Sequence, residues 1–525
     1  MACRPSHARI ISPVYQAIIT RRYLFSRIMP LLAAVAVALC TGLVLTVWSV
    51  MGGFLNMLLS SGKQLIGDVS ISWPVEGIPY YAELVEDLER DPLVGAATPT
   101  LETVGLLALP SGEVRLVQVV GIEPEGYDRV TDFHSRLWWR PIAEPLKKDK
   151  AGEDPRLGNP EVFQRLLEDG KRLAEVRAGD APGAPARPAI VLGLEVSGYN
   201  VRTEQGFVQP RWGFGPAEDV TLTVMPFSRS GVLMGQSDRV LPVANEFRTG
   251  LYEIDAKWVI VPLDVLQEML ALNEAVRAPA GFRPGAVTIN EKGEAVPALP
   301  PAAGIEPARV TNILVRAAEG VTAEQLQARC EAIYTQFAAR HVQSDPSPPD
   351  ANRMIGSGLI FTWDRKPGLQ TFIQAVKKET ALVLVLFSFI SLTAVFLVFS
   401  IFWSMISEKT RDIGVLRAIG AGRAGIAWLF LRYGLILGAV GSLAGGALAY
   451  LIVLNINPIH EWMGRALGLV IWDPKVYYFT DIPNEVDPVQ AIFVLIGGVT
   501  CAVLGAVAPA IRAAWMDPVR ALRFE

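Results

Sequence analysis

A short segment rich in ionisable side chains, SEKTRDIGVLRAIGAGRA, lies at residues 407–424 between two almost purely apolar runs. Apolar residues recur at every third position from Ile413 to Ile419, while acidic and basic residues group on another side of a helix drawn through the segment. The glycines at 420 and 422 can end such a helix. The pattern predicts a short amphipathic helix, and its candidate ATPase-coupling residues are Glu408, Lys409, Arg411, Asp412, Ile413, Leu416 and Arg417.

This charged segment has two interpretations. The first is a positively charged loop that only sets the orientation of the neighbouring membrane spans, for which Lys and Arg are sufficient. The second is a rigid lever that docks in a groove on a cytoplasmic ATPase, which also accounts for the amphipathic pattern and the mixed charge. The residue pattern alone leaves both interpretations open.

Catalytic and metal-binding patterns are absent from the sequence. It contains no Gly-x-x-x-x-Gly-Lys-Ser/Thr loop for ATP phosphates, no His-Glu-x-x-His and no Gly-x-Ser-x-Gly. The four histidines are isolated, and the four cysteines lack metal-ligand spacing. We therefore expect no catalytic residue, metal or cofactor on this chain, and the net charge of −4 gives no support for nucleic-acid binding.

Four apolar segments are long enough to cross a bilayer, which takes about 20 helical residues. The mean hydropathy of +0.32, with 19% charged residues, is typical of a few spans combined with a large water-exposed part. Lys and Arg cluster before the first span, between the second and third, and after the fourth, which predicts that both termini are cytoplasmic. The predicted spans are 29–51, 380–406, 425–453 and 489–511, and the predicted cytoplasmic segments are 1–28, 407–424 and 512–525.

The long segment at 52–379 is predicted to fold outside the cytoplasm, with 454–488 as a second extracytoplasmic loop. Strand–helix–strand patterns near both ends of the long segment indicate one α+β unit assembled from its two ends. We therefore predict a membrane α-helical protein with four transmembrane helices and a large α+β extracytoplasmic domain between the first and second. Within that domain we expect a β-rich insertion at about 190–265 and irregular Pro/Ala-rich stretches at 141–188 and 278–308.

Small residues recur every four positions along the third span. Such spacing lets two membrane helices approach closely. Ordinary packing within one subunit and a seam for a second subunit or for sliding cargo are both compatible with it. The helix-packing residues are Gly434, Gly438, Ser442 and Gly446.

The outer end of the first span is free of charge and contains methionine and aromatic residues. Such a surface can line a cleft for acyl chains, because Met adapts to variable shapes. Lipid-facing anchoring with interfacial aromatic residues is the alternative. The candidate cleft residues are Val47, Trp48, Met51, Phe54 and Leu55.

Longer stretches of the sequence resemble a known family. EKTRDIGVLRAIGA, directly after an apolar span, resembles the signature of the FtsX-like permease family of ABC transporters, and PAIRAAWMDPVRALRFE resembles the ending of that family. The segment 135–188 departs from the family and resembles an insertion. Further stretches resemble, in the same order, the lipoprotein-releasing LolC/LolE-type branch: SVMGGFLNMLLSSGKQLIGDVSI, VQVVGIEP, AIVLGLEV, FRTGLYEIDAKWVIVPLDVLQEML, TWDRKPGLQTFIQAVKKE and DPKVYYFTDIPNEVDP.

The resemblance implies an FtsX-like permease domain at about 380–520 and a MacB/LolC-like periplasmic domain in an inner-membrane protein. It implies two copies of a cytoplasmic ABC ATPase that bind ATP and Mg, and a second permease chain in a homo- or heterodimer. Mechanotransmission would then release lipoprotein cargo from membrane lipids towards a periplasmic carrier. MacB-type export of another cargo and FtsX-like regulation of a periplasmic cell-wall hydrolase are the alternatives.

Overall fold

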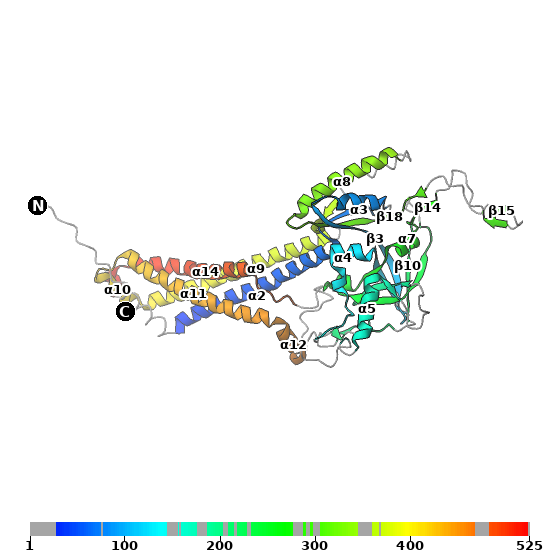
Figure 1. Ribbon diagram of the computed structural model, residues 1–525. Helices are drawn as coiled ribbons and strands as arrows, with labels where there is room; N and C mark the ends of the chain where they lie inside the picture. The colour runs from blue at the N-terminus through cyan, green and yellow to red at the C-terminus, as the bar shows by residue number, and fades with distance from the viewer. Residues whose placement is uncertain are drawn as a thin grey trace. The chain divides into compact units, whose positions relative to one another are not determined.

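The computed structural model divides into two compact units (Figure 1). One unit comprises 1–57, 374–467 and 481–525, and the other comprises 58–373 and 468–480. Most of the predicted segment 1–28, much of 278–308 and the middle of 454–488 lie outside the described residues. The structure describes residues 28–74, 77–143, 156, 159–175, 186–202, 208–209, 211–214, 218–227, 233–276, 287–289, 295–297, 305–344, 360–366, 369–467 and 482–522.

Four helices of the described chain are long and apolar enough to span a membrane, and a large α/β domain lies between the first and second, so the predicted fold class is confirmed. The apolar segments are Leu31–Met57, Ile373–Glu408, Arg423–Leu454 and Pro488–Ala514. They belong to α2 (Ile28–Ile66), α9 (Leu369–Glu408), α11 (Arg423–Leu454) and α14 (Pro488–Ala514). Three shorter helices accompany them: α10 (Thr410–Ala418), α12 (Ile456–Leu467) and α15 (Pro518–Leu522).

Both α2 and α9 extend well beyond the apolar runs at 29–51 and 380–406. The helix α2 runs for 39 residues and ends at Ile66; Gly67 follows with a φ of +75°, which suits a glycine after a helix end. The helix α9 begins early because its first turns bury Ile373 and Val376 among polar residues. Hydropathy alone therefore underestimates these helices, since it does not register amphipathic extensions.

The large α/β domain is built on one mixed sheet. Its strand order is β12-β7-β13-β4-β3-β19-β1-β20, with β10 paired to β3 and β11 paired to β10. The strands are β1 (Val69–Ser72), β3 (Val94–Ala108), β4 (Val114–Ile122), β7 (Ile190–Gly193), β10 (Val220–Val224), β11 (Ser237–Leu241), β12 (Val243–Phe247), β13 (Trp258–Pro262), β19 (Asn312–Ala317) and β20 (Ile360–Thr362). The first strand, β1, pairs with β19 and β20 from the far end of the domain, as expected for a unit assembled from both ends.

The described part of the domain also contains short elements outside this sheet. They are the strand pairs β2 (Ile78–Pro79) with β18 (Arg309–Val310), β5 (Ala174–Glu175) with β6 (Arg187–Pro188), β8 (Val201–Arg202) with β9 (Val208–Gln209), β14 (Ala275–Val276) with β17 (Ile305–Glu306) and β15 (Val287–Ile289) with β16 (Ala295–Pro297), the helix α6 (Tyr252–Asp255), and the 3-10 helices η1 (Phe133–Arg136) and η6 (Trp363–Arg365).

Helices cover both faces of the sheet, because successive strand residues point to opposite faces. Val119 of β4 belongs to one apolar core and Val120 to the other. The first core also takes in α3 (Tyr81–Glu89), α7 (Leu263–Met269) and α8 (Ala323–Ser344), and the second takes in α4 (Pro124–Thr131). The sheet is thus the middle layer of three.

One edge of β3 is only partly paired. Along its other edge, β3 pairs with β4 from Thr100 to Ala108. On the edge in question, β19 pairs with β3 as far as Thr100, and β10 pairs with it from Gly105 onward. Among the described residues, positions 101–104 of β3 therefore have no strand beside them on this edge.

The predicted β-rich insertion at 190–265 is not a separate body. Its strands β7, β10, β11, β12 and β13 all join the main sheet. Every residue of β7 is buried, and so is the centre of β13, from Val259 to Val261. Strands that are apolar on both faces require interior positions in a covered sheet, which explains why this stretch lies within the core.

The prediction of irregular structure at 141–188 is wrong in part, because this stretch contains the helix α5 (Pro160–Arg172). Pro160 occupies the first turn, where proline is well tolerated. The helix buries Phe163 and Leu166, and Phe163 stacks on Trp139 with ring centroids 5.7 Å apart. Only a few apolar residues form the buried face of α5, so its mostly charged sequence did not indicate an amphipathic helix.

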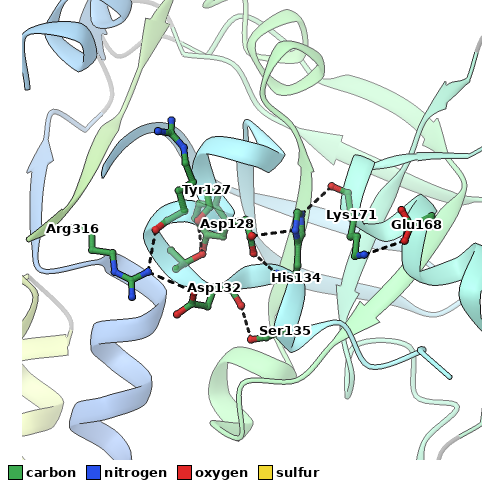
Figure 2. Close-up of polar contacts among 10 residues, drawn as sticks. Tyr127, Asp128, Asp132, His134, Ser135, Glu168, Lys171 and Arg316 are labelled. Atoms are coloured by element: carbon green, nitrogen blue, oxygen red, sulfur yellow. Dashed lines mark hydrogen bonds and ion pairs between the residues drawn. The ribbon is translucent and has the colours of Figure 1, made fainter. Parts of the chain in front are cut away.

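Polar contacts join α5 to the segment around α4 (Figure 2). The Nδ1 atom of His134 lies 3.1 Å from Oδ2 of Asp128, and its Nε2 lies 3.3 Å from the carbonyl oxygen of Lys171. Lys171 in turn donates to Glu168, 3.0 Å away. His134 thus contacts the C-terminal end of α5 and the α4 segment at the same time.

The segment 135–188 also contacts a buried carboxyl group, that of Glu246. Trp139 Nε1 donates to Glu246 Oε2 over 2.6 Å, and both residues are almost fully buried. Burial raises the pKa of Glu246 from 4.5 to about 7. Burial likewise raises the pKa of Asp255 from 3.8 to about 6, although Thr249 donates to it.

Candidate coupling segment and membrane-helix packing

The charged segment at 407–424 forms a separate short helix, α10, between the spans α9 and α11. It ends with two hydrogen bonds: Gly420 N donates to Arg417 O and Ala421 N donates to Leu416 O. With Gly420 at a φ of +102°, this is the Schellman arrangement, in which a left-handed residue stops the helix. The end of α10 is therefore defined by its own backbone.

One residue anchors α10 to the membrane helices. Ile413 is 3% exposed and belongs to an apolar cluster with residues of α9, α11 and α14, among them Phe402, Ile426 and Ala510. Gly414 beside it is also buried. Because its side chain is buried in this cluster, Ile413 fixes α10 to the membrane helices.

The expected single apolar face of α10 is wrong. Ile419 is 80% exposed, whereas Ile413 is buried and Leu416 is half-buried. At about 100° per residue, positions six apart differ in direction by about 120°, so Ile413 and Ile419 point different ways. The solvent side of α10 instead combines Val415 and Ile419 with charged residues.

Charged residues predicted for this segment lie mainly on the exposed side. Glu408, Arg411 and Asp412 are exposed, and Lys409 Nζ lies 3.0 Å from Asp412 Oδ2. Arg417 is partly buried. The short C-terminal helix α15 packs against α10 and exposes Val519. The two helices together present a mixed apolar and charged surface that sequence reasoning assigned to α10 alone.

Arginine–tryptophan contacts tie the helix ends together near α10. The guanidinium of Arg512 lies over the ring of Trp403 at 3.8 Å, which joins α14 to α9. The guanidinium of Arg423 lies over Trp515 at 4.6 Å, which joins the start of α11 to the residue after α14. Cation–π contacts of this kind contribute about 0.5–1 kcal/mol at exposed sites.

The small residues of α11 pack within the chain. A Cβ on Gly434 would lie 2.8 Å from Ala506 Cβ, and one on Gly438 would lie 2.9 Å from Ala502 Cβ, both on α14. Gly446 similarly faces Leu495, and Ser442 lies beside Gly498. The neighbouring line, Gly441 and Gly445, meets the backbone of α2. These positions therefore let α11 approach α14 and α2 of the same subunit.

Comparisons with known proteins agree with this architecture. Residues 384–518 match the family described as FtsX-like permease C-terminal. The chain is 25% identical over 175 residues to the lipoprotein-releasing system transmembrane protein LolC of Xylella fastidiosa, a match that covers 33% of this chain and 42% of that protein. It is 30% identical over 166 residues to LolC of Haemophilus influenzae, covering 32% and 39%, and 28% identical over 117 residues to LolE of the same organism, covering 22% and 28%.

The chain carries an FtsX-like permease domain and is similar to LolC- and LolE-type permeases. Its alignments span less than half the length of these curated relatives. The periplasmic region of MacB from Actinobacillus actinomycetemcomitans is 8% identical to the permease, with a TM-score of 0.24, covering 53% of this chain and 87% of that structure. A TM-score this low adds nothing to the description of the fold.

A cavity of about 240 Å³ lies among α2, α9 and α14 of the permease. Of the predicted cleft residues, Trp48 lines it; Val47, Met51, Phe54 and Leu55 are not among its lining residues, and Phe54 is buried. Sequence reasoning missed the deeper lining residues on α2, although their helical spacing could have indicated one face. These are Val37, Cys40, Thr41 and Val44.

Proposed function

We propose that the permease is the membrane subunit of an ABC transporter that extracts lipoproteins from the inner membrane. A separate subunit would hydrolyse ATP, with its own bound Mg, and this chain would be a non-catalytic partner. The similarity to LolC and LolE supports this cargo, and the FtsX-like domain supports the transporter class. The observation that carries the proposal is the anchored and outwardly exposed helix α10.

The construction of α10 suits the transmission of force. Its inner side enters the apolar cluster of the membrane helices through Ile413, and its outer side, with α15, exposes Val415, Ile419 and Arg411. A partner that pushes on the exposed side would displace the anchor and the packed helices with it, because close-packed interiors transmit strain. The inferred movement is mechanical and needs no aqueous pore.

The acyl chains of the proposed cargo determine how much free energy its extraction requires. Each CH₂ removed from an apolar environment costs about 0.8 kcal/mol, so exposing several acyl chains would cost tens of kcal/mol. We infer that two ATPase copies and a second permease chain, identical or related, share this work. In this arrangement both termini and α10 are cytoplasmic, and the α/β domain is periplasmic, where it passes cargo to a carrier.

Affinity purification tests the proposal directly. The tagged full-length permease is purified from its native membrane in mild detergent, and bound proteins and acylated peptides are identified by mass spectrometry. We expect an ABC ATPase together with lipoproteins, and loss of the ATPase when Glu408, Arg411 and Leu416 are all replaced by alanine. The matched control is Val162→Ala on the extracytoplasmic α5.

The possible results separate the parts of the proposal. Undiminished ATPase recovery with the triple alanine variant would refute the role of α10. The same ATPase with a cell-wall hydrolase or an export channel, and without acylated peptides, would refute the lipoprotein cargo.

A further inference from the structure

A groove in the extracytoplasmic domain opens where β3 lacks a neighbouring strand. Its volume is about 550 Å³, within the range of sites for small organic ligands. Glu102, Thr103 and Val104 of β3 line it, at the gap between β19 and β10. The interruption in the sheet therefore creates a site rather than a simple edge.

One part of the groove is strongly apolar. Val104, Met225 and Phe227 form its rim with exposed fractions of 53%, 42% and 52%. Leu270 and Leu272, which follow α7, add further apolar side chains to the wall. Apolar side chains gathered at this exposure mark a binding surface more often than single exposed ones do, and Met and Phe accommodate flexible chains.

The other part of the groove is polar, and its two charged side chains form an ion pair with each other. Lys366 Nζ lies 2.8 Å from Glu102 Oε1, with both side chains largely buried. The backbone N of Glu102 donates to Thr311 Oγ1 over 2.7 Å, which replaces the missing strand partner at this position. Because the two charges already compensate each other, this end suits an uncharged polar group such as an ester or amide better than an ion.

An apolar stripe continues from the groove along the sheet. Leu106 follows Val104 on the same face of β3, and its register partner on β4 is Leu116. Leu106, Val114 and Leu116 are all exposed, on the face that also carries Thr221 and Thr223 of β10. An alkyl chain longer than the groove would find apolar surface along this stripe.

We propose that this groove binds one acyl chain of the lipid-modified cargo, with its ester or amide end beside Lys366 and Glu102. The inference rests on the proposed function, because it takes the acylated cargo from there. The two-part chemistry of the groove matches that of an acyl chain and its linkage. The position of Lys366 in the sequence also fits this proposal, because it lies just before α9, which begins at Leu369 and continues as a candidate membrane span. The site would shelter a chain after it leaves the bilayer.

Photocrosslinking of the full-length permease in nanodiscs tests this inference. The probe is a diacylglyceryl-cysteine peptide with a diazirine in one acyl chain, and the comparison probe is a phosphatidylethanolamine with the same diazirine. The groove variant is Met225→Glu with Phe227→Glu. The control is Val162→Glu on α5, because Val162 is 41% exposed and so matches Met225.

We expect lipopeptide crosslinks on peptides that contain Met225 or Phe227, reduced about tenfold in the groove variant and unchanged in the control. Equal labelling of wild type and groove variant would overturn the inference. Labelling of the groove by phosphatidylethanolamine that excess lipopeptide does not displace would also overturn it. Crosslinks confined to the membrane helices would overturn the groove but leave the proposed function intact, whereas absence of lipopeptide crosslinks anywhere would overturn both.

Discussion

Gly445 on α11 directly faces the backbone of Ala38 on α2: a Cβ at position 445 would overlap the Ala38 carbonyl oxygen. Real Cβ atoms do not approach a carbonyl oxygen this closely, and backbone cannot move aside as a flexible side chain can. The contact between the first and third spans therefore depends on glycine at this position.

The first prediction concerns this contact. Gly445→Ala should lower the melting temperature of the detergent-solubilised permease, since overpacking costs about 1–3 kcal/mol. The control is Gly497→Ala on α14, where an added Cβ meets nothing within 4 Å. There the better helix propensity of alanine should be neutral or stabilising by up to about 1 kcal/mol. Equal melting temperatures for the two variants would show that α2 and α11 do not touch at Gly445.

The second prediction concerns a hydroxyl group inside the membrane helices. Thr41 Oγ1 on α2 is buried and has no hydrogen-bond partner among the described residues. Thr41→Val should therefore raise the melting temperature, because an unsatisfied buried polar group costs about 1–3 kcal/mol. Thr46 offers the contrast, since its Oγ1 donates to the Gly42 carbonyl over 2.8 Å. Thr46→Val should lower the melting temperature, and a gain there as large as at Thr41 would contradict the explanation.

The third prediction concerns pH. The pKa of Glu246 is 4.5 in its ordinary state and about 7 in the folded domain because of burial. Between these values the folded state keeps a proton that the unfolded state has lost, so stability falls as pH rises from 4.5 to 7, by at most about 3 kcal/mol. Glu246→Gln should remove this contribution while its amide oxygen still accepts from Trp139.

The measurement is the melting temperature of full-length permease followed by tryptophan fluorescence at several pH values. A smaller fall with pH should remain in the variant, because burial raises the pKa of Asp255 in the same direction. If wild type and Glu246→Gln lose stability in parallel between pH 4.5 and 7, Glu246 is already ionised in the folded domain.

The fourth prediction concerns the end of α10. Gly420 has a φ of +102°, so Gly420→Ala should strain or unwind the helix end at a cost of about 1–3 kcal/mol. Gly422→Ala is the matched control, because Gly422 has a φ of −66° and an added Cβ there meets nothing within 4 Å. In a reconstituted complex with the ATPase, we expect cargo release per ATP to fall several-fold only for Gly420→Ala. Equal coupling in both variants would show that the shape of this end is unimportant.

Whether an element could be predicted from the sequence depends on whether local residues or distant contacts determine it. The spans were predictable because long apolar runs have few alternatives, and Gly420 was predictable as a helix end. The helix α5 was not, because its buried face rests on residues such as Phe163, whose partner Trp139 comes from another part of the chain. The opposite orientations of Ile413 and Ile419 follow from helical geometry, but which of them is buried depends on tertiary packing.

The groove could not be predicted from the sequence. The groove exists because the pairing of β19 with β3 stops at Thr100 of β3, and the pairing of β10 with β3 starts only at Gly105 of β3. Strand register over such distances is set by the whole core and not by local pattern. The cavity among the membrane helices could be predicted only in part. The spacing of Val37, Thr41 and Val44 indicates one face of a helix, but it does not show which helices that face contacts.

The pairing of β1 with β20 has a consequence for how the domain can be handled. Val69 and Thr362 are register partners, so the chain enters and leaves the sheet on adjacent strands. A domain with neighbouring entry and exit points can be exchanged between host proteins without rebuilding either. Residues 69–362 could therefore be exchanged as one unit between related proteins while the membrane helices remain unaltered.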